Sequence, residues 1–377
     1  MHFHMPVELY FGSGTIQKIE SVVKKNLRAQ HPVLITDKGV ANAGLLNPIL
    51  SIFKEIEVFD TIEANPKSDN INTIAEKIRQ IKPDLIIAVG GGSPLDAGKA
   101  LALLATNPGE IQTYEGKEKY QNDPLPLLAI PTTCGTGSEV TWVSVITDVK
   151  RKFKISVKGP MMYPAVSIVD PDMIKTLPRS IIASTGLDAL THAVEAFLSK
   201  PATAITDTNA VKACQLILGS IEGAYKDIKN NHEDRENLML GSTIAGFAFG
   251  NSDVTAVHCI SESIGAVYDV AHGVANSIFL PYVLEYNLPA CTPKMAKLAR
   301  EVWITETNDE KASKGLIKLI KELSARLEIP KFKDLNIDSD QFEMIADMSF
   351  KNGSAPSNPR DLAVEDFMNI LENTHAG

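Results

Sequence analysis

The pattern of apolar residues changes near residue 180, and this change constrains the fold more than any other feature of the chain. Before it, short runs rich in Val, Ile and Leu alternate with stretches of helical periodicity; after it, every periodic stretch is helical. Short strands separated by helical crossovers predict a parallel sheet. We therefore predict an α/β domain with a parallel sheet over residues 1–180 and an all-helical domain over residues 181–377.

The expected strands are short, rich in β-branched residues and followed by Gly, Pro or Asp. They cover residues 33–36, 85–89, 127–130 and 166–169. Crossover helices are expected over residues 71–80 and 94–105. The second half is expected to form helices over residues 185–198, 206–226, 235–248, 255–267, 293–302, 311–327, 339–349 and 363–371.

A glycine-rich turn follows the expected strand at residues 85–89, in the segment LIIAVGGGSPLDAGKA. We expect a helix opened by Ser93, with Pro94 at its first position. Gly91 and Gly92 would let the backbone approach a ligand, and the helix amides would attract an anion such as pyrophosphate. The segment is not GxGxxG, because Leu95 stands at the third glycine position. A tight turn without a ligand remains an equal alternative.

A second polar loop, IPTTCGTGSEVT, follows the next strand and contains Thr132 and Thr133. Loops at the carboxyl ends of neighbouring parallel strands are where an open α/β sheet binds its ligand. Asp37 follows the first strand and could accept hydrogen bonds from an adenosine ribose, which favours NAD over NADP. The alternative is that Asp37 only caps the following turn.

Asp188 and His192 are one helical turn apart in GLDALTHAVEA, and His258 and His272 follow in two later segments. The apolar residues around them predict burial, and a buried carboxylate needs a partner or a metal ion. One carboxylate and three imidazoles suit Fe(II) or Zn(II) better than Ca(II) or Mg(II). An ion pair or a cap between Asp188 and His192 is the alternative that the first pair leaves open.

Composition restricts the partners and the location of the protein. The net charge of −9, without a basic patch, argues against nucleic acid or an anionic membrane as a partner. The apolar runs look too short to span a bilayer, and the first residues lack the order of a signal peptide. The cysteines show no metal or disulfide spacing, so we expect reduced thiols and a cytoplasmic protein. They are Cys134, Cys214, Cys259 and Cys291.

These segments resemble the iron-dependent (group III) alcohol dehydrogenases. The matching stretches run in order from about residue 10 to residue 370: FGSG, VGGGSPLDAGK, IPTTCGTGSEVT, VDPDMI, GLDALTHAVEA, FGN followed by VH, HGVAN and NPRDLAVED. The resemblance implies a doubly wound, nucleotide-binding first domain, a helical second domain, an active site in the cleft between them, and a homodimer or higher homo-oligomer. It implies that Asp188, His192, His258 and His272 hold the metal. It implies cofactor contacts, with NAD(H), from Asp37, Asn65, Gly91, Gly92, Ser93, Asp96, Thr132, Thr133 and Lys154.

The chain departs from many family members at Glu262, where they carry a further histidine near the metal. The proton-transfer role of that histidine therefore cannot be transferred to this chain. We predict that Glu262 faces the active-site cleft and either holds a water molecule or selects the substrate. A helix carboxylate paired elsewhere is the alternative.

The predicted reaction is hydride transfer between NAD(H) and a small primary alcohol or aldehyde, with the metal as Lewis acid. Aldehyde reduction is the expected direction in the cell. A dehydroquinate-synthase-like or glycerol-dehydrogenase-like enzyme is the alternative on this scaffold, and a nucleotide-binding regulator is an alternative of another class. The substrate is left open among lactaldehyde, 3-hydroxypropanal, succinate semialdehyde, sulfoacetaldehyde and simple alkanals. The pocket is expected near Thr141, Trp142, Phe249, Asn251 and Ser357.

Overall fold

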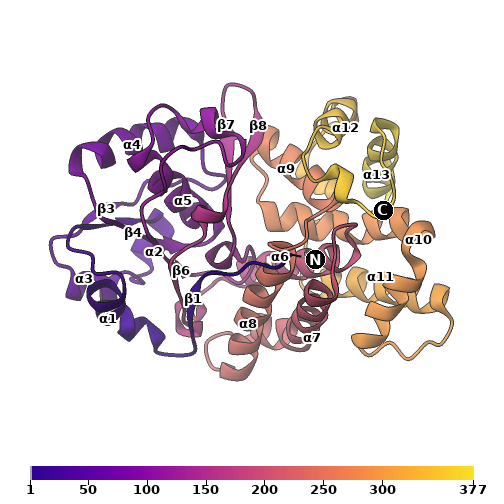
Figure 1. The fold of residues 1–377 in the computed structure, drawn as a ribbon. Coiled ribbons are helices and arrows are strands. Elements are labelled where there is room, and N and C mark those ends of the chain that lie inside the picture. The colour runs from indigo at the N-terminus through magenta and orange to yellow at the C-terminus, as the bar shows by residue number, and fades with distance from the viewer. Residues whose placement is uncertain (1) are drawn as a thin grey trace. The chain divides into compact units, whose positions relative to one another are not determined.

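The computed structural model describes residues 2–377, and the chain divides into two compact units. One unit is residues 4–177, and the other is residues 178–377 together with residues 2 and 3. In Figure 1 the first unit runs from indigo to magenta and carries the sheet. The second runs on to yellow and is helical.

A six-stranded sheet forms the centre of the first unit, in the order β1-β9-β6-β4-β2-β3. Every neighbouring pair in it is parallel. Its strands are β1 (Glu8–Phe11), β2 (Pro32–Ile35), β3 (Glu57–Phe59), β4 (Leu85–Gly90), β6 (Leu127–Pro131) and β9 (Val166–Val169). Because strand-to-strand crossovers in a parallel sheet need intervening helices, this arrangement confirms the predicted α/β fold class.

Helices cover both faces of this sheet, as a doubly wound fold requires. Alternate residues of a strand point to opposite faces. Ile86 and Ala88 of β4 belong to one apolar core, with α4 (Ser68–Ile81) and α5 (Gly92–Thr106). Ile87 and Val89 belong to a second core, which includes residues of α1 (Ile19–Ser21), α2 (Lys38–Asn42) and α3 (Asn47–Ile52).

A second, three-stranded sheet lies in the same unit, in the order β5-β8-β7. β7 (Val143–Asp148) and β8 (Phe153–Lys158) are antiparallel, and β5 (Gly116–Lys117) pairs with β8. The sequence analysis did not anticipate these strands. Short 3-10 and π-helical turns complete the chain: η1 (Thr15–Lys18), η2 (Val22–Asn26), η3 (Ile111–Tyr114), η4 (Ser138–Val140), η5 (Pro160–Met162), η6 (Pro171–Ile174), η7 (Phe332–Leu335), η8 (Ser339–Gln341) and η9 (Ala355–Ser357).

The second unit consists of helices, and α6 is packed against α7, α8 and α10. The helices are α6 (Arg179–Leu198), α7 (Ala204–Asp227), α8 (His232–Phe249), α9 (Ala256–Tyr268), α10 (His272–Glu301), α11 (Asp309–Arg326), α12 (Phe342–Phe350) and α13 (Val364–Ala376). Three prolines and a kink at Cys291, with φ −137° and ψ 21°, interrupt α10.

Several helix starts differ from the sequence expectation, and two of them concern candidate site residues. α5 begins at Gly92 with Gly91 as its N-cap residue, so Ser93 and Pro94 lie inside the first turn. The glycines take the N-terminal positions because the turn packs too closely for a side chain at Gly92. α10 begins at His272, well before the expected helix at residues 293–302.

By its length and composition, α6 could cross a bilayer. The expectation that every apolar run is too short to do so is therefore wrong on those two criteria. However, 89% of its apolar window is buried inside the protein. This burial is typical of a helix in a protein core. The burial matters for function, because the same helix carries Asp188 and His192.

Candidate functional site

Asp188 and His192 occupy successive turns of α6 and are both buried, at 2% and 4% exposure. Residues four apart on a helix lie on the same face. The imidazole Nδ1 of His192 is 2.9 Å from the backbone oxygen of Asp188 and 3.7 Å from its Oδ1 atom. The pair expected from sequence therefore forms, with both side chains turned inward.

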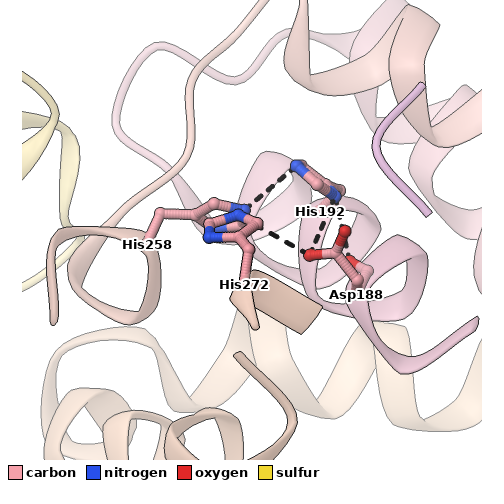
Figure 2. A group of neighbouring side chains, drawn as sticks. All are labelled: Asp188, His192, His258 and His272. Atoms are coloured by element: carbon pink, nitrogen blue, oxygen red, sulfur yellow. Dashed lines mark hydrogen bonds and ion pairs between the residues drawn. The ribbon is translucent and has the colours of Figure 1, made fainter. Parts of the chain in front are cut away.

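His258 of α9 and His272 of α10 meet this pair (Figure 2). The Nε2 atoms of His258 and His192 are 3.0 Å apart, and His272 Nε2 is 3.8 Å from Asp188 Oδ1. One ligand atom from each of the four residues lies within 4.8 Å of all the others. The structure thus brings together all four residues that the sequence analysis assigned to a metal.

The donor atoms of this cluster suit a divalent cation. His192 donates its Nδ1 proton to the backbone oxygen of Asp188, so in the neutral ring its Nε2 atom carries the lone pair. His258 Nδ1 is likewise bonded to a carboxylate oxygen, and in the neutral ring its Nε2 lone pair faces that of His192. Two facing lone pairs 3.0 Å apart repel unless a proton or a cation lies between them. Three imidazole nitrogens and one carboxylate oxygen fit Fe(II) or Zn(II).

Glu195 is the carboxylate that holds His258, and the sequence analysis missed it. Its side chain is 2% exposed, and Oε2 accepts a hydrogen bond from His258 Nδ1. Burial acts to lower the pKa of His258, but the charge and the hydrogen bond of Glu195, together with the charges of Asp188 and Glu262, outweigh it, so the pKa is raised. Glu195 follows Asp188 by seven residues and His192 by three, so helical spacing could have identified it.

Asn276 is a second residue that the sequence analysis missed. It is fully buried on α10, one turn after His272. Its amide nitrogen lies 2.6 Å from Asp188 Oδ1 and 3.1 Å from the Nε2 atoms of both His258 and His272. An amide that donates to Asp188 and faces two imidazole nitrogens favours lone pairs on those nitrogens.

Of the five residues expected near a pocket, Phe249 lies directly at the cluster. Its ring stacks on His192, with centroids 4.2 Å apart and an interplanar angle of 27°. Thr141 is buried and receives a hydrogen bond from Lys99, and Trp142 lies under the ammonium of Lys117.

The other two expected pocket residues, together with Glu262, have hydrogen-bonding partners of their own. Asn251 donates to the backbone oxygen of Phe247, and Ser357 donates to Asp253. Glu262 is half-buried on α9 and accepts a 2.7 Å hydrogen bond from Asn352. Its role in catalysis stays a prediction.

In the first unit, the glycine turn after β4 packs against the loop after β6. A Cβ atom on Gly91 would lie 3.1 Å from Thr133 Cγ2, and one on Gly92 would lie 2.5 Å from Thr136 Cγ2. The amide of Thr132 donates to the backbone oxygen of Gly90. The two polar loops predicted from sequence therefore touch, at the carboxyl edge of neighbouring strands.

Asp37 and Asp96 already have partners within the same unit. Asp37 is the N-cap residue of α2, and its Oδ1 atom accepts from the amide of Val40 at 2.9 Å. Asp96 accepts from Ser138 Oγ at 2.6 Å and from the amide of Val145 at 3.0 Å. Burial raises the pKa of Asp96. Asp96 thus stabilises the segment that follows β6, and its contact with a cofactor stays a prediction.

Two lysines complete this region. Lys154 donates to Asn65 Oδ1 at 2.8 Å, so these two expected cofactor residues contact each other. Lys99, which the sequence analysis did not single out, is 1% exposed and donates to Ser138, Thr141 and the backbone oxygen of Val143. Burial lowers its pKa to about 8.

Comparison with known proteins places this geometry in a family. The model of iron-containing alcohol dehydrogenases matches residues 6–171, and the model of the C-terminal part of the same family matches residues 182–375. A 1,3-propanediol dehydrogenase of Citrobacter freundii is 38% identical, over 93% of this chain and 92% of its own. The NADPH-dependent butanol dehydrogenase of Clostridium saccharobutylicum is 32% identical, over 100% and 98%. The NAD-dependent methanol dehydrogenase of Bacillus methanolicus is 31% identical, over 99% of each chain.

A solved structure agrees with these sequence matches. The crystal structure of a 1,3-propanediol oxidoreductase superimposes with a TM-score of 0.94 at 36% identity and covers 99% of each chain. The matches span nearly the whole chain and include both family models. The chain therefore belongs to the iron-containing alcohol dehydrogenase family and is an oxidoreductase.

Proposed function

We propose that this enzyme transfers hydride reversibly between NAD(H) and a small primary alcohol or aldehyde, and that it reduces aldehydes in the cell. The observation that carries the proposal is the convergence of Asp188, His192, His258 and His272 within ligand distance of one another. Family membership supports the reaction class. We assign nucleotide binding to residues 1–180 and metal binding to residues 181–377.

The four converging residues would hold one Fe(II) or Zn(II) ion, which when bound polarises the oxygen of the alcohol or aldehyde. Asp188 contributes the negative charge of the ligand set, and Asn276 holds its Oδ1 atom in place. Three of the four ligands are almost fully buried, whereas the His272 side chain is 24% exposed. We infer that the substrate reaches the cluster on the His272 side.

The glycine turn after β4 would hold the pyrophosphate of the nucleotide. Gly91 and Gly92 have no side chains that would keep a phosphate from the backbone, and the amides at the start of α5 can donate to it. Ser93, Asp96, Thr132, Thr133, Asn65 and Lys154 would complete the cofactor contacts. The relatives include one named NAD-dependent and one named NADPH-dependent, so the proposed preference for NAD rests on the charge of Asp37.

The substrate is proposed to be small. The three relatives are named for 1,3-propanediol, butanol and methanol, which are all short alcohols. The ring of Phe249 on His192 would give the substrate an apolar side wall beside the metal. We further propose a cytoplasmic homodimer: the four cysteines are buried and unbridged, and the edge strand β1 offers backbone groups to a second copy.

The alternatives are not favoured. Three relatives that match nearly the whole chain are named as a 1,3-propanediol dehydrogenase, an alcohol dehydrogenase and a butanol dehydrogenase. None of these three names refers to a dehydroquinate-synthase-like or glycerol-dehydrogenase-like reaction. A nucleotide-binding regulator would have no need of a buried four-residue metal cluster.

The test uses the full-length protein stripped of metal and reloaded with either Fe(II) or Zn(II). Oxidation of NADH and NADPH is followed with a panel of short aldehydes, from propanal and butanal to 3-hydroxypropanal. We expect turnover with one of the metals and none in the stripped protein. The matched variant His258→Ala should lose metal-dependent turnover while it retains NADH binding, measured by fluorescence. Full activity of the stripped protein would refute the proposal.

A further inference from the structure

The two oxygens of the buried Glu195 carboxylate bind different partners. Oε1 accepts from the amide of Val257 at 2.9 Å and from the hydroxyl of Thr255. Oε2 accepts from Nδ1 of His258. Val257 and Thr255 lie at the start of α9, so one side chain of α6 binds both this helix start and the imidazole that follows it.

We propose that Glu195 is a positioning residue of the metal centre: it fixes the proton of His258 on Nδ1 and so leaves Nε2 as the metal-binding atom. This inference rests on the proposed function, because it concerns the same cluster. An ionised carboxylate only accepts hydrogen bonds, so the His258 nitrogen that faces it must carry the proton. A carboxylate behind a metal-bound histidine also orients the ring and makes it a stronger ligand.

His192 provides an internal contrast. Its Nδ1 proton is held by the backbone oxygen of Asp188, one turn earlier on its own helix. That acceptor is part of the helix and is present whatever the side chains are. His258 has its Nδ1 acceptor on another helix, so its proton depends on Glu195.

The competing explanation is that Glu195 only caps the first turn of α9. A carboxylate that accepts from the Val257 amide near a helix N-terminus stabilises that end in any case. A useful experiment must therefore keep the cap and change only the group that faces His258.

Glu195→Gln has this property because the three donors dictate how its amide orients. The backbone N–H of Val257 can only donate, so the amide oxygen must take the place of Oε1, where the bonds from Val257 and Thr255 are kept. The amide NH₂ then takes the place of Oε2 and donates to His258 Nδ1. This places the proton of His258 on Nε2, the atom that should bind the metal.

The first measurement is the Zn(II) affinity of wild type and Glu195→Gln, by competition with a chromogenic chelator. We expect the variant to bind about 10–100-fold more weakly, the usual cost of losing a carboxylate behind a metal-bound histidine. The matched control is Thr255→Val, which weakens the cap but leaves the Oε2 bond to His258 intact. The Zn(II) affinity of Thr255→Val should lie within about twofold of that of wild type. Because this variant loses part of the cap, the midpoint of its unfolding transition should fall further than the midpoint of Glu195→Gln.

The second measurement needs no metal: it is the tautomer of His258 in stripped protein labelled with ¹⁵N-histidine, with the signal assigned by its loss in His258→Ala. We expect the proton on Nδ1 in wild type and on Nε2 in Glu195→Gln. An unchanged tautomer and equal Zn(II) affinity would overturn the proposal and leave Glu195 as a cap. If wild type itself bound no metal, the proposed function would fail, while the tautomer would still decide the role of Glu195.

Discussion

Gly273 fixes how closely α10 approaches α6, and its replacement by alanine gives a quantitative test of the cluster. It is the second residue of α10, directly after His272. A Cβ atom there would lie 2.5 Å from the backbone oxygen of Ser184 and 2.9 Å from its carbonyl carbon, and the next nearest atom is Asp188 Cβ at 3.3 Å. Two of these atoms belong to the α6 backbone, which cannot move aside as the end of a flexible side chain can.

The size of the effect follows from these distances. A carbon and a carbonyl oxygen approach each other to about 3.3 Å, so the start of α10 must withdraw by roughly 0.8 Å from the 2.5 Å position. His272 moves with it, away from Asp188. Metal sites tolerate ligand displacements of about 0.2 Å. We therefore expect Gly273→Ala to weaken Zn(II) binding about 10–100-fold and to lower the free energy of unfolding by about 1–3 kcal/mol.

Zn(II) affinity is measured by chelator competition, and stability by urea unfolding of the metal-free protein. Gly219→Ala is the matched control, because Gly219 is a helical glycine whose Cβ would meet only Trp303, at 3.9 Å. This control should gain about 0.5–1 kcal/mol of stability and keep its metal affinity. If Gly273→Ala bound Zn(II) as tightly as wild type, the contact between α6 and α10 would not position His272.

Three further predictions concern single side chains. Burial lowers the pKa of Lys99 from 10.5 to about 8, against the charges of Asp96 and Glu139, so between these pH values the unfolded chain holds more protons than the folded one. As the pH rises across that interval, the free energy of unfolding of wild type should therefore rise by up to about 3 kcal/mol relative to that of Lys99→Met. If urea unfolding gave both proteins the same pH dependence, this prediction would be contradicted. Asp37→Asn keeps the N-cap acceptor for Val40 but removes the charge, so the ratio of kcat/KM for NADPH to that for NADH should rise about tenfold, and an unchanged ratio would rule out charge as the discriminator. Glu262→Gln keeps a side chain long enough to reach Asn352, and we expect altered turnover or substrate preference across the aldehyde panel; identical profiles would leave Glu262 as a helix carboxylate.

The sequence predicts the four inner strands of the parallel sheet, β2, β4, β6 and β9, because they are nearly continuous apolar runs. It does not predict the edge strands β1 and β3, which are short and begin with an exposed glutamate. All six residues of β4 are buried, and its observed bounds differ from the expected ones by a single residue. β7 and β8 mix buried with half-buried residues, which is a weaker signal in six-residue segments. The first part of α10 was missed because it contains Pro281 and Pro289. Its neighbours keep the segment helical, since tertiary packing overrides the low helix propensity of proline.

The contacts within the candidate site are also of two kinds: some join residues close in sequence, and others join residues far apart in sequence. Asp188 and His192 follow from the spacing of one helix, and no long-range information is needed to place them together. The meeting of His258 with His192 depends on how α9 packs, since the two residues are 66 positions apart. Helical spacing on α6 and α10 can also identify Glu195 and Asn276, but only after the ligands on those helices have been accepted as metal-binding residues.

The composition of α6 links the fold to the proposed chemistry. This helix is long and apolar enough to cross a membrane, yet it carries three buried polar residues, Asp188, His192 and Glu195. A buried carboxylate destabilises a fold by several kcal/mol unless it is paired or bound to a metal. Glu195 is paired by the start of α9, and Asp188 by the amide of Asn276 on α10. These bonds join α6 to the start of α9 and to α10, the two helices that carry His258 and His272 to the cluster.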